Sequence, residues 1–164
     1  MEVELRFFFI VMATLLLSSN LAAEQRQFGD WFVVRADNGD MVAATQQDNF
    51  SKALVYRCFQ ALSKCAHVVI ADIECEDANT YPVLVNSEHS ALSMNTLCSV
   101  NEGRSELILT EFDLIHEIIR KSDVIGIAVP MTSGHFKVVR FSLDGSNRAL
   151  DYTEGNLVDS AEYL

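Results

Sequence analysis

The chain lacks an apolar run long enough to cross a bilayer as a helix, which takes about 20 residues. Its apolar run at residues 7–17 is much shorter, and Ser18-Ser19-Asn20 and the small residues Ala22 and Ala23 follow it. This order is typical of a cleaved secretory leader. We therefore expect a signal peptide at residues 1–23, a mature protein that is periplasmic or secreted, and no stable membrane anchor.

Basic residues are scarce as well. The chain has 12 Lys and Arg against 23 Asp and Glu, which gives a formal net charge of −11. Such a surface repels the phosphates of nucleic acids and anionic lipids, so we expect no nucleic acid partner. It would attract a basic protein, although acidic surfaces also serve solubility alone.

One dense acidic stretch runs from Asp72 to Asp77 and includes Glu74 and Glu76. It lacks the glycine and the ligand spacing of an EF-hand, and Cys75 lies within it. We interpret it as a solvated turn instead of a calcium site.

Motifs of catalysis are missing too. The chain has no Gly-x-Ser-x-Gly and no Ser-x-x-Lys sequence, and no second histidine follows His116-Glu117 at the zincin spacing. Cys58, Cys65 and His67 do not have a standard zinc spacing. We predict a protein that is not an enzyme, with no catalytic residue, no metal and no cofactor. The alternative is a hydrolase with a non-standard site, in which Cys58 pairs with His116 or His135.

Four cysteines are present, Cys58, Cys65, Cys75 and Cys98. In an oxidising compartment an even number indicates disulfides, here two, with three possible pairings. Residues 53–59 and 66–71 are typical of two strands of a short hairpin, which would bring Cys58 close to Cys65. We therefore favour Cys58–Cys65 and Cys75–Cys98, each stabilising the fold by about 2 to 4 kcal/mol.

Short β-type segments recur at intervals of roughly 10 to 15 residues, as in all-β domains. The clearest hairpin joins Trp31–Arg35 to Met41–Thr45 through Asn38-Gly39, a dipeptide that tolerates positive φ. Further candidate strands are residues 53–59, 66–71, 81–85, 91–98, 106–110, 124–129 and 136–143.

Helical spacing occurs once, where apolar residues fall at Phe112, Ile115, Ile118 and Ile119. We predict a mainly β domain over residues 24–152, a sandwich or small barrel of about eight or nine antiparallel strands with one α-helix at about 111–121. A short second helix fits residues 146–151, and residues 153–164 are predicted to be a polar, loose tail.

Two places are candidates for a contact surface. Trp31 and Phe32 are adjacent, so on a strand they point to opposite faces, and one face could be a binding patch. Alternatively, Trp31 fills the core. The loop from Met131 to His135 offers the second surface. The predicted binding residues are thus Trp31, Phe32, Met131 and His135.

Phe28-Gly29-Asp30-Trp31 and the later stretches 118–129 and 134–150 resemble the invasion-associated locus B proteins of bacterial envelopes. That family contains small, exported, β-rich proteins with disulfides and has no established catalytic residues to transfer. In this chain Arg35 follows Trp31 where a cysteine would be expected, and all four cysteines lie in the middle. The resemblance therefore implies an envelope-associated accessory role, but not a disulfide scheme.

Together these features predict an exported, non-enzymatic accessory protein that acts through protein contacts. The alternative within binding is an acidic inhibitor of a basic secreted enzyme such as a lysozyme.

Overall fold

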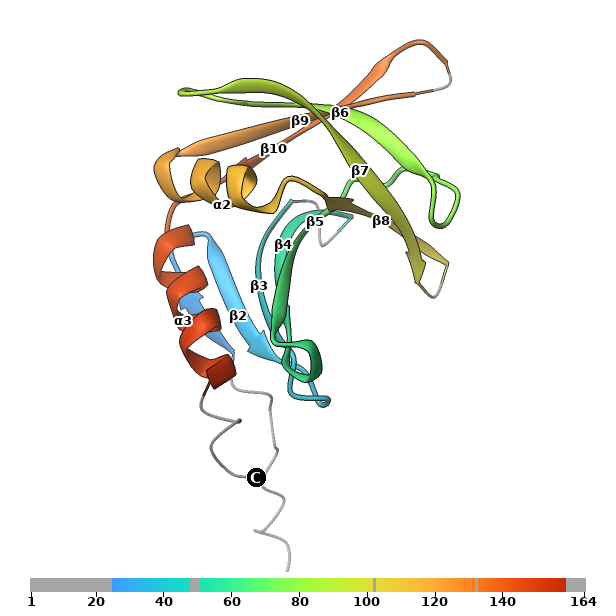
Figure 1. The fold of residues 1–164 in the computed structure, drawn as a ribbon. Helices are drawn as coiled ribbons and strands as arrows, with labels where there is room; N and C mark the ends of the chain where they lie inside the picture. Colours follow the sequence, from blue (N-terminus) through green and yellow to red (C-terminus); the bar gives the residue numbers. More distant parts are fainter. Residues whose placement is uncertain (1–24, 48–50, 102, 132, 159–164) are drawn as a thin grey trace, which may run out of the picture.

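The computed structural model describes residues 25–47, 51–101, 103–131 and 133–158. The predicted signal peptide, residues 1–23, lies outside them. Within the described residues, ten strands form one antiparallel sheet, accompanied by two α-helices and one short 3-10 helix (Figure 1). The elements are β1 (Arg26–Phe28), β2 (Trp31–Arg35), β3 (Met41–Gln47), β4 (Lys52–Phe59), η1 (Gln60–Leu62), β5 (Lys64–Ile70), β6 (Thr80–Ser87), β7 (Ala91–Asn101), β8 (Arg104–Leu109), α2 (Phe112–Lys121), β9 (Val124–Pro130), β10 (Phe136–Ser142) and α3 (Ser146–Val158).

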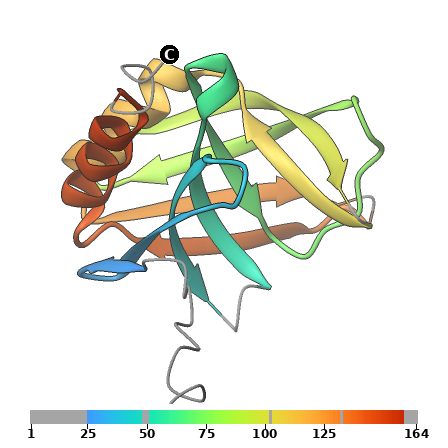
Figure 2. The same cartoon turned by 90° about the horizontal axis from the view of Figure 1, so that it is seen from below.

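The strand order is β1-β2-β3-β4-β5-β8-β7-β6-β9-β10, which is sequential except that β8, β7 and β6 run in reverse. The sheet is open, with β1 and β10 at its edges, but it curls until β10 comes back beside β3 and β4 (Figure 2). The side chain of Gln47 on β3 donates a hydrogen bond to the carbonyl oxygen of Arg140 on β10. The prediction of a mainly β, antiparallel fold is confirmed.

The predicted hairpin at Asn38-Gly39 is present. Val34 faces Val42 across β2 and β3, and the Ala36 amide donates to the Asp40 carbonyl oxygen at 2.8 Å. Gly39 has a φ of 87°, which an L side chain rarely adopts and which explains the glycine.

Helix α2 matches the predicted helix. Its residues Ile115, Ile118 and Ile119 are buried because their spacing places them on one face of the helix. Asp113 in the first turn and Arg120 in the last turn suit the helix dipole.

Helix α3 is longer than predicted. It runs to Val158, so the prediction of a loose tail is wrong for residues 153–158, and residues 159–164 lie outside the described part. Thr153 is fully buried, and its hydroxyl donates to the Ala149 carbonyl oxygen at 2.8 Å. Because that bond satisfies the hydroxyl, a polar residue is buried on the helix without a large desolvation cost. The Tyr152 ring also packs against Phe28.

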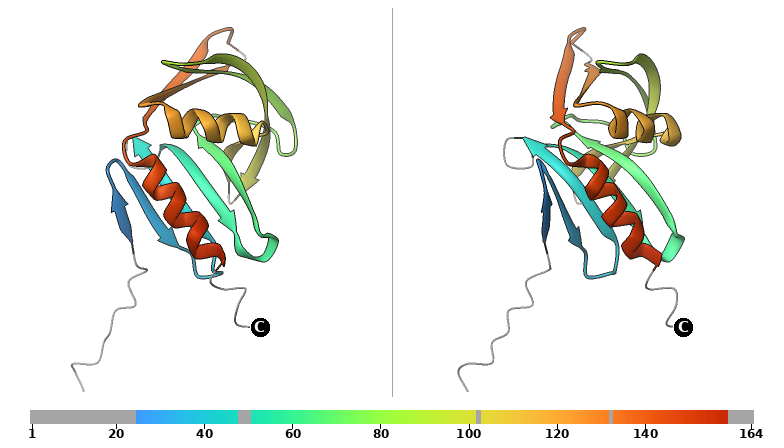
Figure 3. Two further views of the ribbon diagram at one scale, coloured as in Figure 1. Left: turned by 60° about the vertical axis from the view of Figure 1, so that its left-hand side comes forward. Right: turned by 90° about the vertical axis from the view of Figure 1, so that its left-hand side faces the viewer.

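Both helices share one face of the sheet, with α3 across β1 to β4 and α2 against β5 and β9 (Figure 3). The main core lies between them and the sheet and includes Trp31, Ile119 and Leu150. A second, smaller cluster is formed by residues of the opposite register on β3, β4 and β5. Its buried members are Ala44, Ala53, Val55, Val68 and Ile70.

The structure forms both predicted disulfides, Cys58–Cys65 and Cys75–Cys98, which leaves no free cysteine in the chain. Cys58 and Cys65 face each other directly across the β4–β5 hairpin. Because its sulfur is bonded to that of Cys65, Cys58 holds no thiol for the nucleophilic site considered above. Among the described residues, no helix has both the length and the apolar character needed to span a membrane.

Candidate functional site

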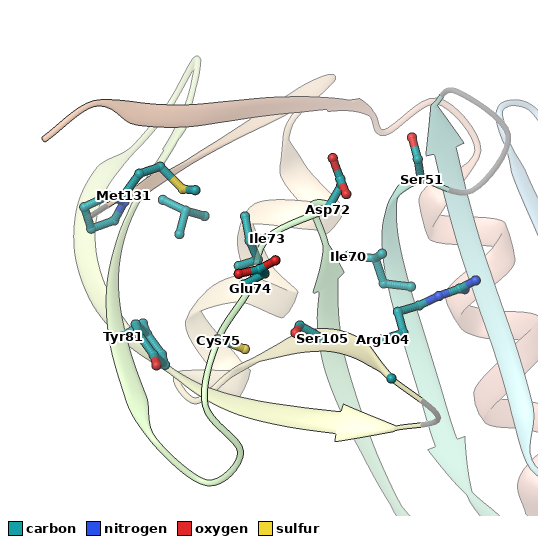
Figure 4. Close-up of a pocket in the computed structure, with 13 residues that line it drawn as sticks. Ser51, Ile70, Asp72, Ile73, Glu74, Cys75, Tyr81, Arg104, Ser105 and Met131 are labelled. Carbon is teal, nitrogen blue, oxygen red and sulfur yellow. The ribbon is translucent and has the colours of Figure 1, made fainter. Parts of the chain in front are cut away.

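A cleft of about 870 Å³ opens between the loop after β5, the β7–β8 turn and the β9–β10 hairpin (Figure 4). Its apolar walls come from Ile73, Tyr81 and Met131. Ile73 is buried, whereas Tyr81 and Met131 are half-buried. The sequence pattern identified Met131 as a binding candidate, and its side chain does line the cleft.

Charged side chains also border this cleft. Asp72 and Glu74 come from the loop after β5, and Arg104 comes from the start of β8 (Figure 4). Asp72 accepts an ion pair from Lys137 at 3.0 Å. The carboxylate of Glu74 makes no hydrogen bond or ion pair with another described residue, so it is available to a ligand.

The loop after β5 carries the acidic stretch from Asp72 to Asp77, and this acidic loop is attached to neighbouring strands at several points. The Cys75–Cys98 disulfide ties it to β7, and the backbone amide of Glu76 donates to the Tyr81 hydroxyl at 2.9 Å. Asp77 accepts a hydrogen bond from the Val100 amide at 2.9 Å. Its acidic side chains are exposed, as a solvated turn requires, but the loop also forms the wall of a cleft. That second property depends on segments far apart in the sequence, so no local pattern could indicate it.

The other predicted binding residues do not gather at the cleft. Trp31 is fully buried in the main core, so its assignment to an exposed patch is wrong, and the alternative, that it fills the core, holds. Phe32 points to the opposite face of β2, where it packs on the second cluster. His135 is exposed on the β9–β10 hairpin but does not line the cleft.

An exposed apolar surface adjoins the cleft and was missed by the sequence analysis. Phe136 and Val138 on β10 are 56% and 55% exposed, and Phe136 pairs directly with Pro130, which lines the cleft. Val138 and Leu84 flank Ala128 from the two sides of β9. The sequence feature that could have indicated this surface is that β10 carries apolar residues on both faces. Val139 and Phe141 are buried on its inner face, whereas Phe136 and Val138 lie on the outer face.

A second group of polar side chains lies where α2 meets the sheet. The ring of His67 on β5 stacks against both Tyr56 and Phe112, with ring centroids 4.7 and 5.1 Å away. Its Nε2 lies 3.2 Å from Nδ1 of His116 on α2. On the far side of the His116 ring, Arg120 Nε donates to Nε2 at 2.7 Å.

This environment shifts three pKa values. Burial, aided by His116 and Arg120, lowers the pKa of His67 to about 3. Burial and the charge of Arg120 also lower the pKa of His116, against the attraction of Glu154. Burial and a hydrogen bond of 2.8 Å to Glu154 raise the pKa of the Tyr56 hydroxyl. Both histidines are therefore neutral at pH 7.

Helix α3 completes this group through its carboxylates. Arg120 forms ion pairs with Asp151 at 2.8 Å and with Glu154 at 3.4 Å. His67 and His116 are far apart in the sequence, and only the packing of α2 on β5 brings them together. The described residues contain no cluster of three or more metal-ligating side chains.

Comparisons with known proteins complete the description of the site. No family model matches the chain, and no curated protein matches its sequence. The chain is similar in structure to the crystal structure of invasion associated protein B from Bartonella henselae, with a TM-score of 0.57 and 10% sequence identity. The match covers 85% of this chain and 99% of that one. At this identity the likeness establishes a shared fold, which agrees with the resemblance noted in the sequence.

Proposed function

We propose that this chain is an exported, non-enzymatic accessory protein of the cell envelope that binds other proteins. Two disulfides suit an oxidising compartment, which the periplasm and the exterior provide. The shared fold with invasion associated protein B is in keeping with such a location.

The observation that carries the binding role is the cleft between the acidic loop and the β9–β10 hairpin. Its volume of about 870 Å³ lies within the range of binding sites, roughly 300 to 1,000 Å³. Apolar contacts from Ile73 and Met131 would supply affinity, and the unpaired Glu74 carboxylate would orient the bound segment. Phe136 beside the cleft is the kind of exposed aromatic residue that anchors protein contacts.

A second candidate function is the inhibition of a basic secreted enzyme such as a lysozyme. Glu74 favours it, because a carboxylate without a partner among the described residues can pair with a basic side chain entering the cleft. Under this alternative the interaction should weaken as salt rises.

The binding role is tested with the purified exported protein and a displayed library of random peptides. Enriched peptides should bind Met131→Ala and Phe136→Ala at least tenfold more weakly than the wild type by calorimetry. Leu62→Ala is the matched control, since Leu62 is 65% exposed on η1, outside the cleft. The proposal fails if no peptide is enriched over an unrelated protein, or if all three variants bind equally well.

Two further measurements separate the alternatives. If the inhibitor function is correct, Glu74→Gln should weaken the binding of basic peptides and reduce the salt dependence of that binding, and it should leave the binding of apolar peptides unaffected. Export is tested by the intact mass of the product before and after reduction and alkylation. Export is supported if the mass is that of a chain beginning near Glu24 and if its cysteines are alkylated only after reduction. A full-length product with four reduced thiols contradicts export.

A further inference from the structure

Besides the main core, a hydrogen-bond chain that tolerates only one arrangement of protons links α2 to the sheet. Arg120 Nε carries a hydrogen and cannot accept, so His116 Nε2, 2.7 Å away, must be the acceptor. The proton of a neutral His116 then sits on Nδ1, which faces His67 Nε2 at 3.2 Å. His67 Nε2 must accept that bond, and its own proton lies on Nδ1, which is buried without a partner among the described residues.

Protonation of His116 breaks this chain at its Arg120 end, because both ring nitrogens then carry a hydrogen. A hydrogen on Nε2 would point at the hydrogen on Arg120 Nε, and two positive groups would stand 2.7 Å apart. His67 cannot take the proton instead, because it is fully buried against Tyr56 and Phe112, where a charge is costly.

An alternative acceptor is already nearby on α3. Glu154 Oε1 lies 3.6 Å from His116 Nε2 and accepts the Tyr56 hydroxyl at 2.8 Å. The remaining charges that face His116 are Arg120 and Asp113 on α2 and Asp151 on α3. A protonated His116 would therefore turn to Glu154 and compete with Tyr56 and Arg120 for that carboxylate.

We propose that these residues form an acid-sensitive latch, in which uptake of one proton from solvent at His116 Nε2 exchanges Arg120 for Glu154 as its partner and loosens α2 and α3 from the sheet. The latch is independent of the binding role proposed above. Burial and Arg120 keep the pKa of His116 below the ordinary histidine value, so the latch is closed at neutral pH. It opens as the pH falls below about 6.5, because the packed state then binds fewer protons than the loosened state.

Hydrogen exchange of the intact chain, corrected for intrinsic rates, tests the latch between pH 7.5 and pH 4.5. In the wild type, protection of α2 and α3 should fall by up to about tenfold per pH unit on the acid side of the transition, ahead of the central strands β4 and β5. The fluorescence of Trp31, the single tryptophan, reports on the main core at the same time.

Three variants separate the latch from general acid unfolding. His116→Gln preserves an acceptor for Arg120 and a donor for His67 but cannot take up a proton at this position, so α3 should lose protection in acid no earlier than the central strands β4 and β5. Glu154→Gln should move the transition to lower pH, since the charged acceptor is lost. His89→Gln, at an exposed turn, is the matched control and should behave like the wild type.

The proposal is overturned if α3 is equally protected at both pH values in the wild type, or if His116→Gln retains the full transition. If a urea melt at pH 7.5 shows that His116→Gln does not fold, nitrogen-15 spectra of the wild-type histidines decide instead. Protonation of His116 must then coincide with the loss of protection, and a His116 that stays neutral throughout contradicts the latch.

Discussion

The indole Nε1 of Trp31 donates a hydrogen bond of 3.2 Å to the carbonyl oxygen of Ser142, 111 residues later in the chain. The bond joins β2, near one edge of the sheet, to β10, the strand at the other edge. It therefore helps to hold the open sheet in its curled form, together with the contact between Gln47 and Arg140.

Replacing Trp31 should cost far more stability than replacing its neighbour. Trp31→Ala leaves a large cavity and an unpaired carbonyl oxygen, and we expect a loss of about 3 to 5 kcal/mol. Phe32→Ala acts at a half-buried position and should cost less than half as much. Urea denaturation of both variants measures the difference, and equal losses would contradict the assignment of Trp31 to the core.

Two glycines with similar backbone angles should respond differently to alanine. Gly145 and Gly134 have φ values of 84° and 80°, so either substitution costs about 1 to 2 kcal/mol in backbone strain. At Gly145 an added Cβ would also lie 1.9 Å from the Phe28 carbonyl oxygen, whereas at Gly134 it meets nothing within 4 Å. We expect Gly145→Ala to cost about 1 to 3 kcal/mol more in thermal or urea denaturation. A Gly134→Ala variant as unstable as Gly145→Ala would show that this close approach is absent.

The two disulfides should contribute unequally. Cys75–Cys98 closes a loop with a sequence separation of 23 and Cys58–Cys65 one of 7. On chain entropy alone the longer loop stabilises by about 1 kcal/mol more, within a total of about 2 to 4 kcal/mol for each bridge. Urea denaturation of the double variants Cys75→Ala/Cys98→Ala and Cys58→Ala/Cys65→Ala gives both values. A larger loss for the Cys58–Cys65 pair would mean that packing at the buried Cys58 outweighs loop closure.

Acid should destabilise the fold through His67. Its pKa is about 3 in the folded protein, below the ordinary value of 6.5, so the unfolded chain binds the proton more readily. The stabilisation is complete above pH 6.5 and is lost as the pH falls from 6.5 toward 3, by up to about 1.4 kcal/mol per unit. His67→Phe keeps the aromatic stack and removes the titration. Between pH 7 and pH 5 the wild type should therefore lose more unfolding free energy than His67→Phe does. Equal losses would contradict the low pKa of His67 in the folded protein.

Local features of the fold were predictable because neighbours in sequence decide them. Asn38-Gly39 sets the β2–β3 turn through its backbone, and the spacing of Ile115, Ile118 and Ile119 defines the buried face of α2. The pairing of Cys58 with Cys65 follows from a hairpin of adjacent strands. Part of the candidate site was accessible in the same way, since Met131 lies in a short loop between two apolar strands.

The rest of the candidate site was not predictable, because it is made from residues of distant segments. Ile73, Tyr81 and Met131 share a cleft only after β6 inserts between β7 and β9. Thr153 looked like the start of a loose tail, yet α3 extends over the sheet and buries it. No motif connects His67 with His116, which lies 49 residues later, and only the packing of α2 on β5 brings their rings together.

The sequence by itself determined the β-rich character of this protein, the hairpin that brings Cys58 close to Cys65, and its one strongly amphipathic helix. These depend on turn chemistry, side-chain period and short loops, all of which act over a few residues. Only the tertiary structure decided the order of β5 and β8, the burial of Trp31, the cleft and the histidine pair. Each of these is set by which surfaces pack together once the sheet curls, and the free energy of that packing is a property of the whole fold.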